Sequence, residues 1–180
     1  ANCIDIHNQS VRIDDEACLQ CGLCVAACPT ETFNTRRHTS RMLYDQVARA
    51  ASAYEQCYIT CTRALARKPE SNEICLPCVG MLSADIWFSI LTDFDNVSVY
   101  LPLGVCDRCR TTTGEEAYTQ AIATAEEWTG ATVGLEVDGN NLNHNFTRAY
   151  IRSQFISNAM NGAERLVSAS TPVLAGAKAI

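Results

Sequence analysis

The sequence predicts an α/β fold (α+β overall), with a cysteine-rich N-terminal part, a small β-α-β unit whose strands end in cysteine pairs, and a C-terminal helix. Two observations support this prediction. Eleven cysteines among 180 residues stand at short, regular spacings. After residue 72, short apolar runs alternate with helical patterns, which is typical of parallel strands joined by helices. We therefore expect three parts, over residues 1–68, 73–140 and 141–180.

The first part is organised around a loop at residues 18–29 with the pattern C-x2-C-x2-C-x3-C-P. Residues 3–7 and 10–14 alternate apolar and polar side chains, which predicts a β-hairpin leading into this loop. Cysteines at these spacings are typical ligands of an iron–sulfur cluster, and Gly22 allows the backbone to pass close to it. Structural zinc is the weaker alternative, since it favours two separated cysteine pairs. We interpret Cys3 as a spare cysteine of the hairpin.

This loop resembles that of bacterial-type 4Fe-4S ferredoxins over residues 2–35, a likeness that includes Pro29. The resemblance implies a ferredoxin-like, cluster-binding arrangement for the N-terminal part. The ligands that it implies for one 4Fe-4S cluster are Cys18, Cys21 and Cys24. The cysteine before the proline, Cys28, is implied to bind a second cluster.

A helix is predicted from residue 39 to residue 65, because apolar residues recur there every three or four positions. This spacing puts Cys57 and Cys61 on one helical face. The pair also resembles the end of a second ferredoxin loop, although Ala51 and Tyr54 stand where the earlier cysteines of such a loop would be. We therefore predict that Cys57 and Cys61 are cluster ligands, with buried core cysteines as the alternative.

The second part contains two C-x2-C pairs, each following a predicted strand. Apolar residues before the first pair and at residues 97–101 predict these strands, and helical patterns follow at residues 83–94 and 113–128. Consecutive parallel strands end at the same edge of a sheet, so the sulfurs of the two pairs could meet there. These ligand candidates are Cys75, Cys78, Cys106 and Cys109. Two such pairs suit a 4Fe-4S cluster, a 2Fe-2S cluster or zinc.

Residues 73–118 also resemble the iron–sulfur delta subunit of methyl-viologen-reducing hydrogenases, from Cys78-Val79-Gly80 to the second cysteine pair. In that family the subunit passes electrons to heterodisulfide reductase. The resemblance implies a relay role inside a larger redox enzyme, with the four cysteines of the second part as ligands.

Composition excludes several classes of function. The net charge of −6 argues against nucleic acid as a partner, which would demand a basic face. The chain has no run of 18 apolar residues, so we expect no membrane span. The odd number of cysteines favours metal ligation over disulfides and hence a cytoplasmic location. A last helix is expected from Asn143, with an apolar face over residues 146–167.

Together these patterns predict an electron-transfer subunit that carries two iron–sulfur clusters, most simply both 4Fe-4S. We expect it to relay single electrons to the other subunits of an oxidoreductase complex. Neither a nucleophile with its base nor a dinucleotide fingerprint is present, so we expect no small-molecule substrate and no catalysis by this chain itself. One alternative is a single-cluster ferredoxin carrier with a zinc-stabilised interaction module. Another is a thiol-disulfide oxidoreductase that uses one of the C-x2-C pairs.

Overall fold

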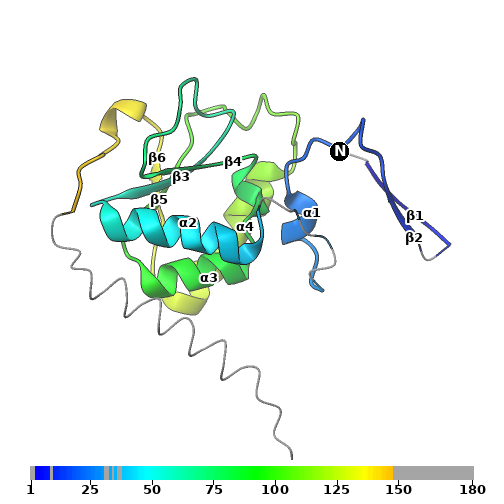
Figure 1. Cartoon of the computed structure of the whole chain (residues 1–180), viewed down its shortest axis with the longest axis horizontal. Coiled ribbons are helices and arrows are strands. Elements are labelled where there is room, and N and C mark those ends of the chain that lie inside the picture. Colours follow the sequence, from blue (N-terminus) through cyan, green and yellow to red (C-terminus); the bar gives the residue numbers. More distant parts are fainter. Residues whose placement is uncertain (1–2, 9, 31–32, 34, 36–37, 148–180) are drawn as a thin grey trace, which may run out of the picture. The chain divides into compact units, whose positions relative to one another are not determined.

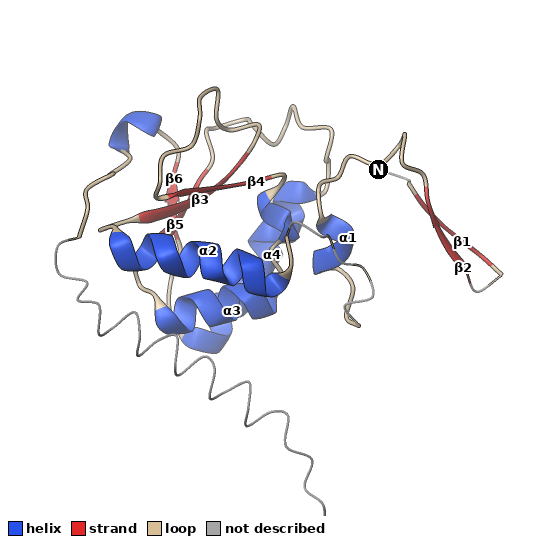
Figure 2. Cartoon of the chain, viewed as in Figure 1, coloured by secondary structure: helices blue, strands red, loops and turns tan. Residues whose placement is uncertain are grey.

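The computed structural model describes residues 3–8, 10–30, 33, 35 and 38–147, all of which belong to one compact unit (Figure 1). It contains a two-stranded antiparallel hairpin and a four-stranded sheet accompanied by helices (Figure 2). The described residues thus mix helices with a parallel sheet, as predicted. No described helix is both long and apolar enough to cross a membrane.

The predicted hairpin is present before the cysteine-rich loop. Strands β1 (Ile4–His7) and β2 (Ser10–Ile13) pair antiparallel with Ile4 opposite Ile13. Both strands are exposed along their whole length. The short helix α1 (Leu23–Ala26) lies within the loop that follows.

The larger sheet has the order β4-β3-β5-β6, and all of its strands run parallel. In chain order, its strands are β3 (Cys57–Cys61), β4 (Glu73–Leu76), β5 (Val97–Tyr100) and β6 (Gly134–Glu136). The chain therefore passes over β3 when it goes from β4 to β5. This arrangement places β3 in the middle, with the two cysteine-bearing loops of the second part on either side of it.

The prediction of a helix through Cys57 and Cys61 is wrong. Helix α2 (Ser40–Ala53) ends at Tyr54, and residues 57–61 form the fully buried central strand. Tyr58, Ile59 and Thr60 favour a strand, and burial on both faces removes the polar alternation that would have revealed it. A spacing of four residues puts two side chains on the same face of a strand as well as of a helix, so the cysteine spacing alone did not distinguish the two.

Three of the remaining helices pack together beside the sheet. They are the 3-10 helix η1 (Val79–Met81), α3 (Ala84–Asp93) and α4 (Gly114–Thr129). The 3-10 helix η2 (Gly139–Asn141) follows β6. Helix α2 contacts β3 and β4, while α3 contacts both α2 and α4. Trp87 of α3 and Ala125 of α4 are completely buried in the core that these helices share with the sheet. Gly130 ends α4 in a left-handed conformation with φ 72°, which glycine adopts readily.

The helix expected to begin at Asn143 is not present in the described residues. The chain from Asn143 to Thr147 is not helical, and Phe146 forms a bridge with Tyr54. The rest of the predicted helix, from residue 148, lies outside the described residues, as does the tail. Asn143 N–H donates to the hydroxyl of Tyr58 at 2.9 Å, which holds this segment against β3.

A buried carboxylate fixes the start of β4. Glu73 has a completely buried side chain and accepts two hydrogen bonds from Arg67, at 2.8 and 2.6 Å. Burial raises the pKa of Glu73, but the Arg67 guanidinium, the Glu70 N–H and His144 outweigh it, so the pKa is lowered overall. A carboxyl with a lowered pKa stabilises the fold above its ordinary pKa, and this contribution is lost as the pH falls through the lowered value.

We therefore expect Arg67→Ala to lower the free energy of unfolding by about 2 kcal/mol near neutral pH, less than for a fully buried pair because the guanidinium is half exposed. Urea unfolding, followed by far-UV circular dichroism, measures this change. With Glu73→Gln, the loss of stability as the pH falls from about 5 to about 3 should be smaller than in the parent protein. An unchanged pH dependence in that variant would contradict the prediction.

Candidate metal centres

The loop at residues 18–29 is shaped by hydrogen bonds to Asp14 and by two left-handed residues. The carboxylate of Asp14 accepts from the N–H groups of Glu16 and Ala17, and its carbonyl accepts from Cys18 N–H at 2.9 Å. Gln20 and Gly22 then adopt φ values of 52° and 81°. These two turns reverse the chain between successive cysteines, so the loop curls around its own thiols.

Three thiols of this loop lie close enough to affect one another. Partial burial raises the pKa of Cys24, and the neighbouring Cys21 and Cys18 raise it further. Thiolates that repel one another in this way are stabilised by a cation placed among them. The fourth cysteine, Cys28, has its sulfur 3.5 Å from the hydroxyl oxygen of Thr30.

A second group of cysteines surrounds a small cavity at the carboxyl ends of the parallel strands. The cysteines that line it are Cys61, Cys78, Cys106 and Cys109. Burial raises the pKa of Cys106 to about 11, helped by Glu115 and by the other three thiols. Burial also raises the pKa of Cys78, and Cys21, Cys61 and Cys109 add to the effect. Four sulfurs from the ends of β3, β4 and β5 thus share one enclosed space, which we call the edge cavity.

The edge cavity contains Cys61 where the sequence suggested Cys75. In parallel strands, paired residues point to the same face, and Cys61 pairs with Leu76 while Cys75 pairs with Thr60. Cys75 therefore belongs to the opposite face of the sheet from Cys61 and does not line the cavity.

Cys57 is placed as a core residue. It lies at the beginning of β3, at the other end of the strand from Cys61, and is completely buried. Burial alone raises its pKa to about 12, with no other thiol contributing. An isolated buried thiol of this kind behaves as a small apolar side chain.

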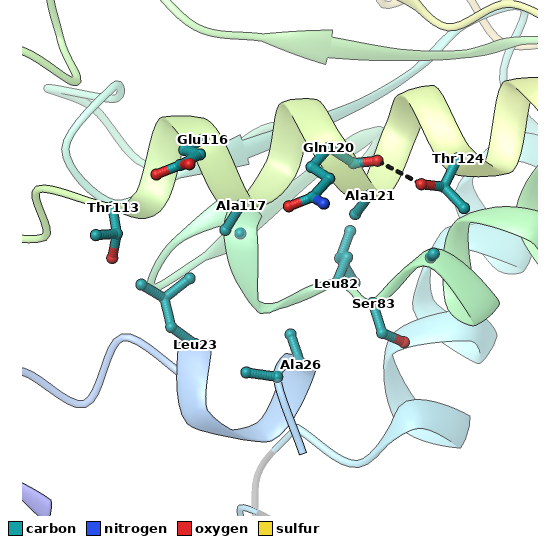
Figure 3. A pocket seen from close by; sticks show the side chains of 13 residues that line it. Leu23, Ala26, Leu82, Ser83, Thr113, Glu116, Ala117, Gln120, Ala121 and Thr124 are labelled. Atoms are coloured by element: carbon teal, nitrogen blue, oxygen red, sulfur yellow. Dashed lines mark hydrogen bonds between the residues drawn. The ribbon is translucent and has the colours of Figure 1, made fainter. Parts of the chain in front are cut away.

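The cysteine-rich loop packs directly beside the edge cavity. A Cβ atom on Gly22 would lie 2.8 Å from Cβ of Met81, and one on Gly80 would lie 2.7 Å from a methyl group of Leu23. Figure 3 shows Leu23 and Ala26 of this loop facing Ala117 and Ala121 of α4. Because Met81 and Gly80 directly follow Cys78, these contacts bring the two groups of cysteines next to each other.

The amino terminus of α4 also borders the edge cavity. A Cβ atom on Gly114 would lie 2.9 Å from the sulfur of Cys78, and Gly114 itself lines the cavity. The absence of a side chain here leaves room for Cys78 and for whatever its sulfur binds. Four thiols are soft ligands that suit iron–sulfur clusters or zinc, so the donor atoms of the edge cavity fit a metal centre.

We expect Gly114→Ala to displace Cys78 and to lower the metal content of the edge cavity. Alanine favours a helix more than glycine does, by about 1 kcal/mol, so a loss of metal would not reflect a weaker helix. Iron and zinc per chain measure the effect. Gly130→Ala at the other end of α4 is the matched control, because it strains a left-handed residue by about 1–2 kcal/mol but places no atom within 4 Å of another group. Equal metal loss in both variants would contradict this prediction.

The comparison with protein families agrees with the loop geometry. Residues 11–33 match the family model described as a 4Fe-4S binding domain. This 4Fe-4S segment contains all but the first residue of strand β2 and the cysteines Cys18, Cys21, Cys24 and Cys28. It indicates a 4Fe-4S cluster and, in general terms, an iron–sulfur electron-transfer role. Neither the search of curated proteins nor that of solved structures finds a match.

The match ends before the edge cavity, so the resemblance of residues 73–118 to the hydrogenase delta subunit stays a prediction. In the part of the chain that the structure describes, no three His, Cys, Asp or Glu side chains are arranged to hold a single metal ion. A 4Fe-4S cluster takes one sulfur on each of four separate irons, so its ligands do not need to converge on one point.

Proposed function

We propose that this protein is an iron–sulfur electron-transfer subunit that carries two clusters and relays single electrons within a multi-subunit oxidoreductase. The first cluster belongs to the 4Fe-4S segment. The second belongs in the edge cavity, with Cys61, Cys78, Cys106 and Cys109 as its ligands. The observation that supports this assignment most directly is that four thiols line one cavity next to the 4Fe-4S segment.

The chemistry of the ligands supports a relay rather than a catalyst. A cluster whose irons are all held by cysteine has no open coordination position, so it exchanges single electrons and does not bind substrate. The protein's contribution is then to exclude water, to set the potential and to hold the two centres close together. Burial of the edge cavity by Leu101 and Val79 serves the first of these purposes.

The placement of the two groups of ligands also supports a role in which other subunits of the complex catalyse the reaction. The contacts of Gly22 with Met81 and of Leu23 with Gly80 bring the two groups of ligands together, which supports electron transfer between them inside the protein. Donor and acceptor would be other subunits, in a reducing compartment such as the cytoplasm where thiolate ligands persist. The acidic first turn of α4, with Glu115 and Glu116, lies beside the edge cavity and is a suitable docking surface for a basic partner.

The thiol-disulfide alternative is less well supported. Such enzymes place a C-x2-C pair at the start of an α-helix, where the helix dipole lowers the thiol pKa. Here Cys75 lies within β4 and α3 begins only at Ala84, while Cys109 precedes the start of α4 by several residues. Burial raises the pKa of Cys75 and of Cys78, which is opposite to what a reactive thiol needs.

Metal analysis of anaerobically purified protein tests the proposal. We expect about eight irons and eight sulfides per chain, without zinc, and low-temperature EPR signals of two interacting clusters after reduction. About four irons together with one zinc would instead identify a single-cluster carrier with a zinc-stabilised module, because zinc takes four thiolates in structural sites. That result would overturn the two-cluster assignment while keeping the first cluster.

A further inference from the structure

The first cluster needs a fourth ligand that its three closely spaced cysteines do not supply. A 4Fe-4S cube is held by four cysteines, and in two-cluster ferredoxins the cysteine before the proline binds the other cluster. The edge cavity uses four cysteines of its own, and Cys57 is buried alone in the core. Cys75 lies within β4, on the face of the sheet opposite Cys61 and outside the edge cavity. The cysteines that remain for the fourth position are Cys3 and Cys28.

Cys3 is fifteen positions before Cys18 in the chain but adjacent to it in space. The two side chains lie beside each other, and both residues are bound through their backbones to Asp14. The backbone holds them in this position, because Asp14 N–H donates to the carbonyl of Cys3 at 2.8 Å while the carbonyl of Asp14 accepts from Cys18 N–H at 2.9 Å. The pairing of Ile4 with Ile13 fixes the register of the hairpin that presents Cys3.

The hairpin itself has little else to stabilise it. Its strands have four residues each, and both are exposed on their two faces, with Ile6 72% and Val11 50% exposed. A two-stranded hairpin without a covered apolar face is marginally stable in water. A bond from its first residue to a metal centre would anchor it at the end where the loop begins.

We propose that Cys3 is the fourth ligand of the first cluster, together with Cys18, Cys21 and Cys24. This inference rests on the proposed function and extends it, since it completes the coordination of the 4Fe-4S segment from outside the C-x2-C-x2-C-x3-C-P pattern. Cys28 is then not required for either cluster. The hairpin becomes part of the metal site, and the cluster shields the Cys3 sulfur from solvent.

Matched variants Cys3→Ala and Cys28→Ala test this assignment after anaerobic reconstitution. We expect Cys3→Ala to lose about four irons, or about one with the appearance of a three-iron EPR signal, while the signal of the second centre stays. Cys28→Ala should keep about eight irons. An unaltered first-cluster signal in Cys3→Ala, or loss of that signal in Cys28→Ala instead, overturns the proposal. Wild-type protein without any iron–sulfur cluster would instead overturn the proposed function.

A second measurement does not depend on whether the variants fold. Alkylation of the wild-type protein, read by mass spectrometry, compares the reactivity of each cysteine before and after the iron is removed by a chelator. We expect Cys3 to be protected in the iron-loaded protein together with Cys18, Cys21 and Cys24, and to react after chelation. Equal alkylation of Cys3 in both forms overturns its role as a ligand.

Discussion

Replacing Cys106 or Cys109 by serine is expected to lower the iron content from about eight to about four per chain, while the first cluster stays in place. Both residues line the edge cavity together with Cys61 and Cys78. Removing one thiolate leaves an iron of the second cluster without its protein ligand, and the remaining three sulfurs lie in a cavity partly closed by Leu101. The assembled cluster should therefore be lost and not merely weakened. Iron and sulfide analysis with EPR measures the change.

Cys75→Ser is the matched control for this experiment. Cys75 is also half-buried and also belongs to a C-x2-C pair, but it lies on the other face of β4 from the edge cavity. We expect this variant to keep about eight irons. Loss of the second cluster in Cys75→Ser, with full retention in Cys106→Ser, would contradict this prediction. It would show that Cys75, and not Cys106, is a ligand of the second cluster.

Cys21→Ser is expected to abolish electron transfer by removing the first cluster. Cys21 lies in the turn between Gln20 and Gly22, next to the contact of Gly22 with Met81. Replacing a residue that only hydrogen-bonds to a metal ligand typically lowers metal affinity or activity about 10–100-fold. Replacing a ligand itself should lower both further. The rate of electron transfer from reduced viologen to a protein acceptor, followed by stopped-flow absorption, measures this loss.

The relay role depends on the outcome of that measurement. If Cys21→Ser lacks the first cluster and still transfers electrons at the wild-type rate, electrons do not pass through the first cluster. The proposed relay role would then be wrong. Cys75→Ser serves again as the control for the general effect of a cysteine replacement, because its expected rate is that of the wild-type protein.

The local parts of the candidate site were predictable from the sequence. The loop at residues 18–29 is formed by consecutive residues. Its glycine and its cysteine spacing lie in one short segment, so the sequence alone predicts a cluster-binding loop there. The hairpin before it and the strands and helices after residue 72 were predicted for the same reason, since each depends on alternation or periodicity within a few residues. The family match at residues 11–33 confirms a 4Fe-4S segment there.

Long-range placement was not predictable. The order β4-β3-β5-β6 puts Cys61 between the two cysteine-bearing loops, but strand order leaves no periodic signal in a sequence. The residues between Tyr54 and Arg63 look helical by spacing because a separation of four is shared by helices and strands. Cys3 was interpreted as a spare residue since its neighbour Cys18 is brought near only by hairpin register. In each case the missing information concerns which distant segments pair.

The central position of β3 has a consequence for how the protein acquires its second cluster. Cys61 ends β3 and Cys78 follows β4, the next strand in the chain, whereas Cys106 and Cys109 follow β5, which pairs with the other side of β3. A slip of β3 by one residue would turn Cys61 toward the opposite face of the sheet. All four sulfurs therefore meet only when two non-local strand pairings, β3 with β4 and β3 with β5, are in register. Cluster insertion at this position would act as a late check on folding, since a chain with misaligned strands could not retain the metal.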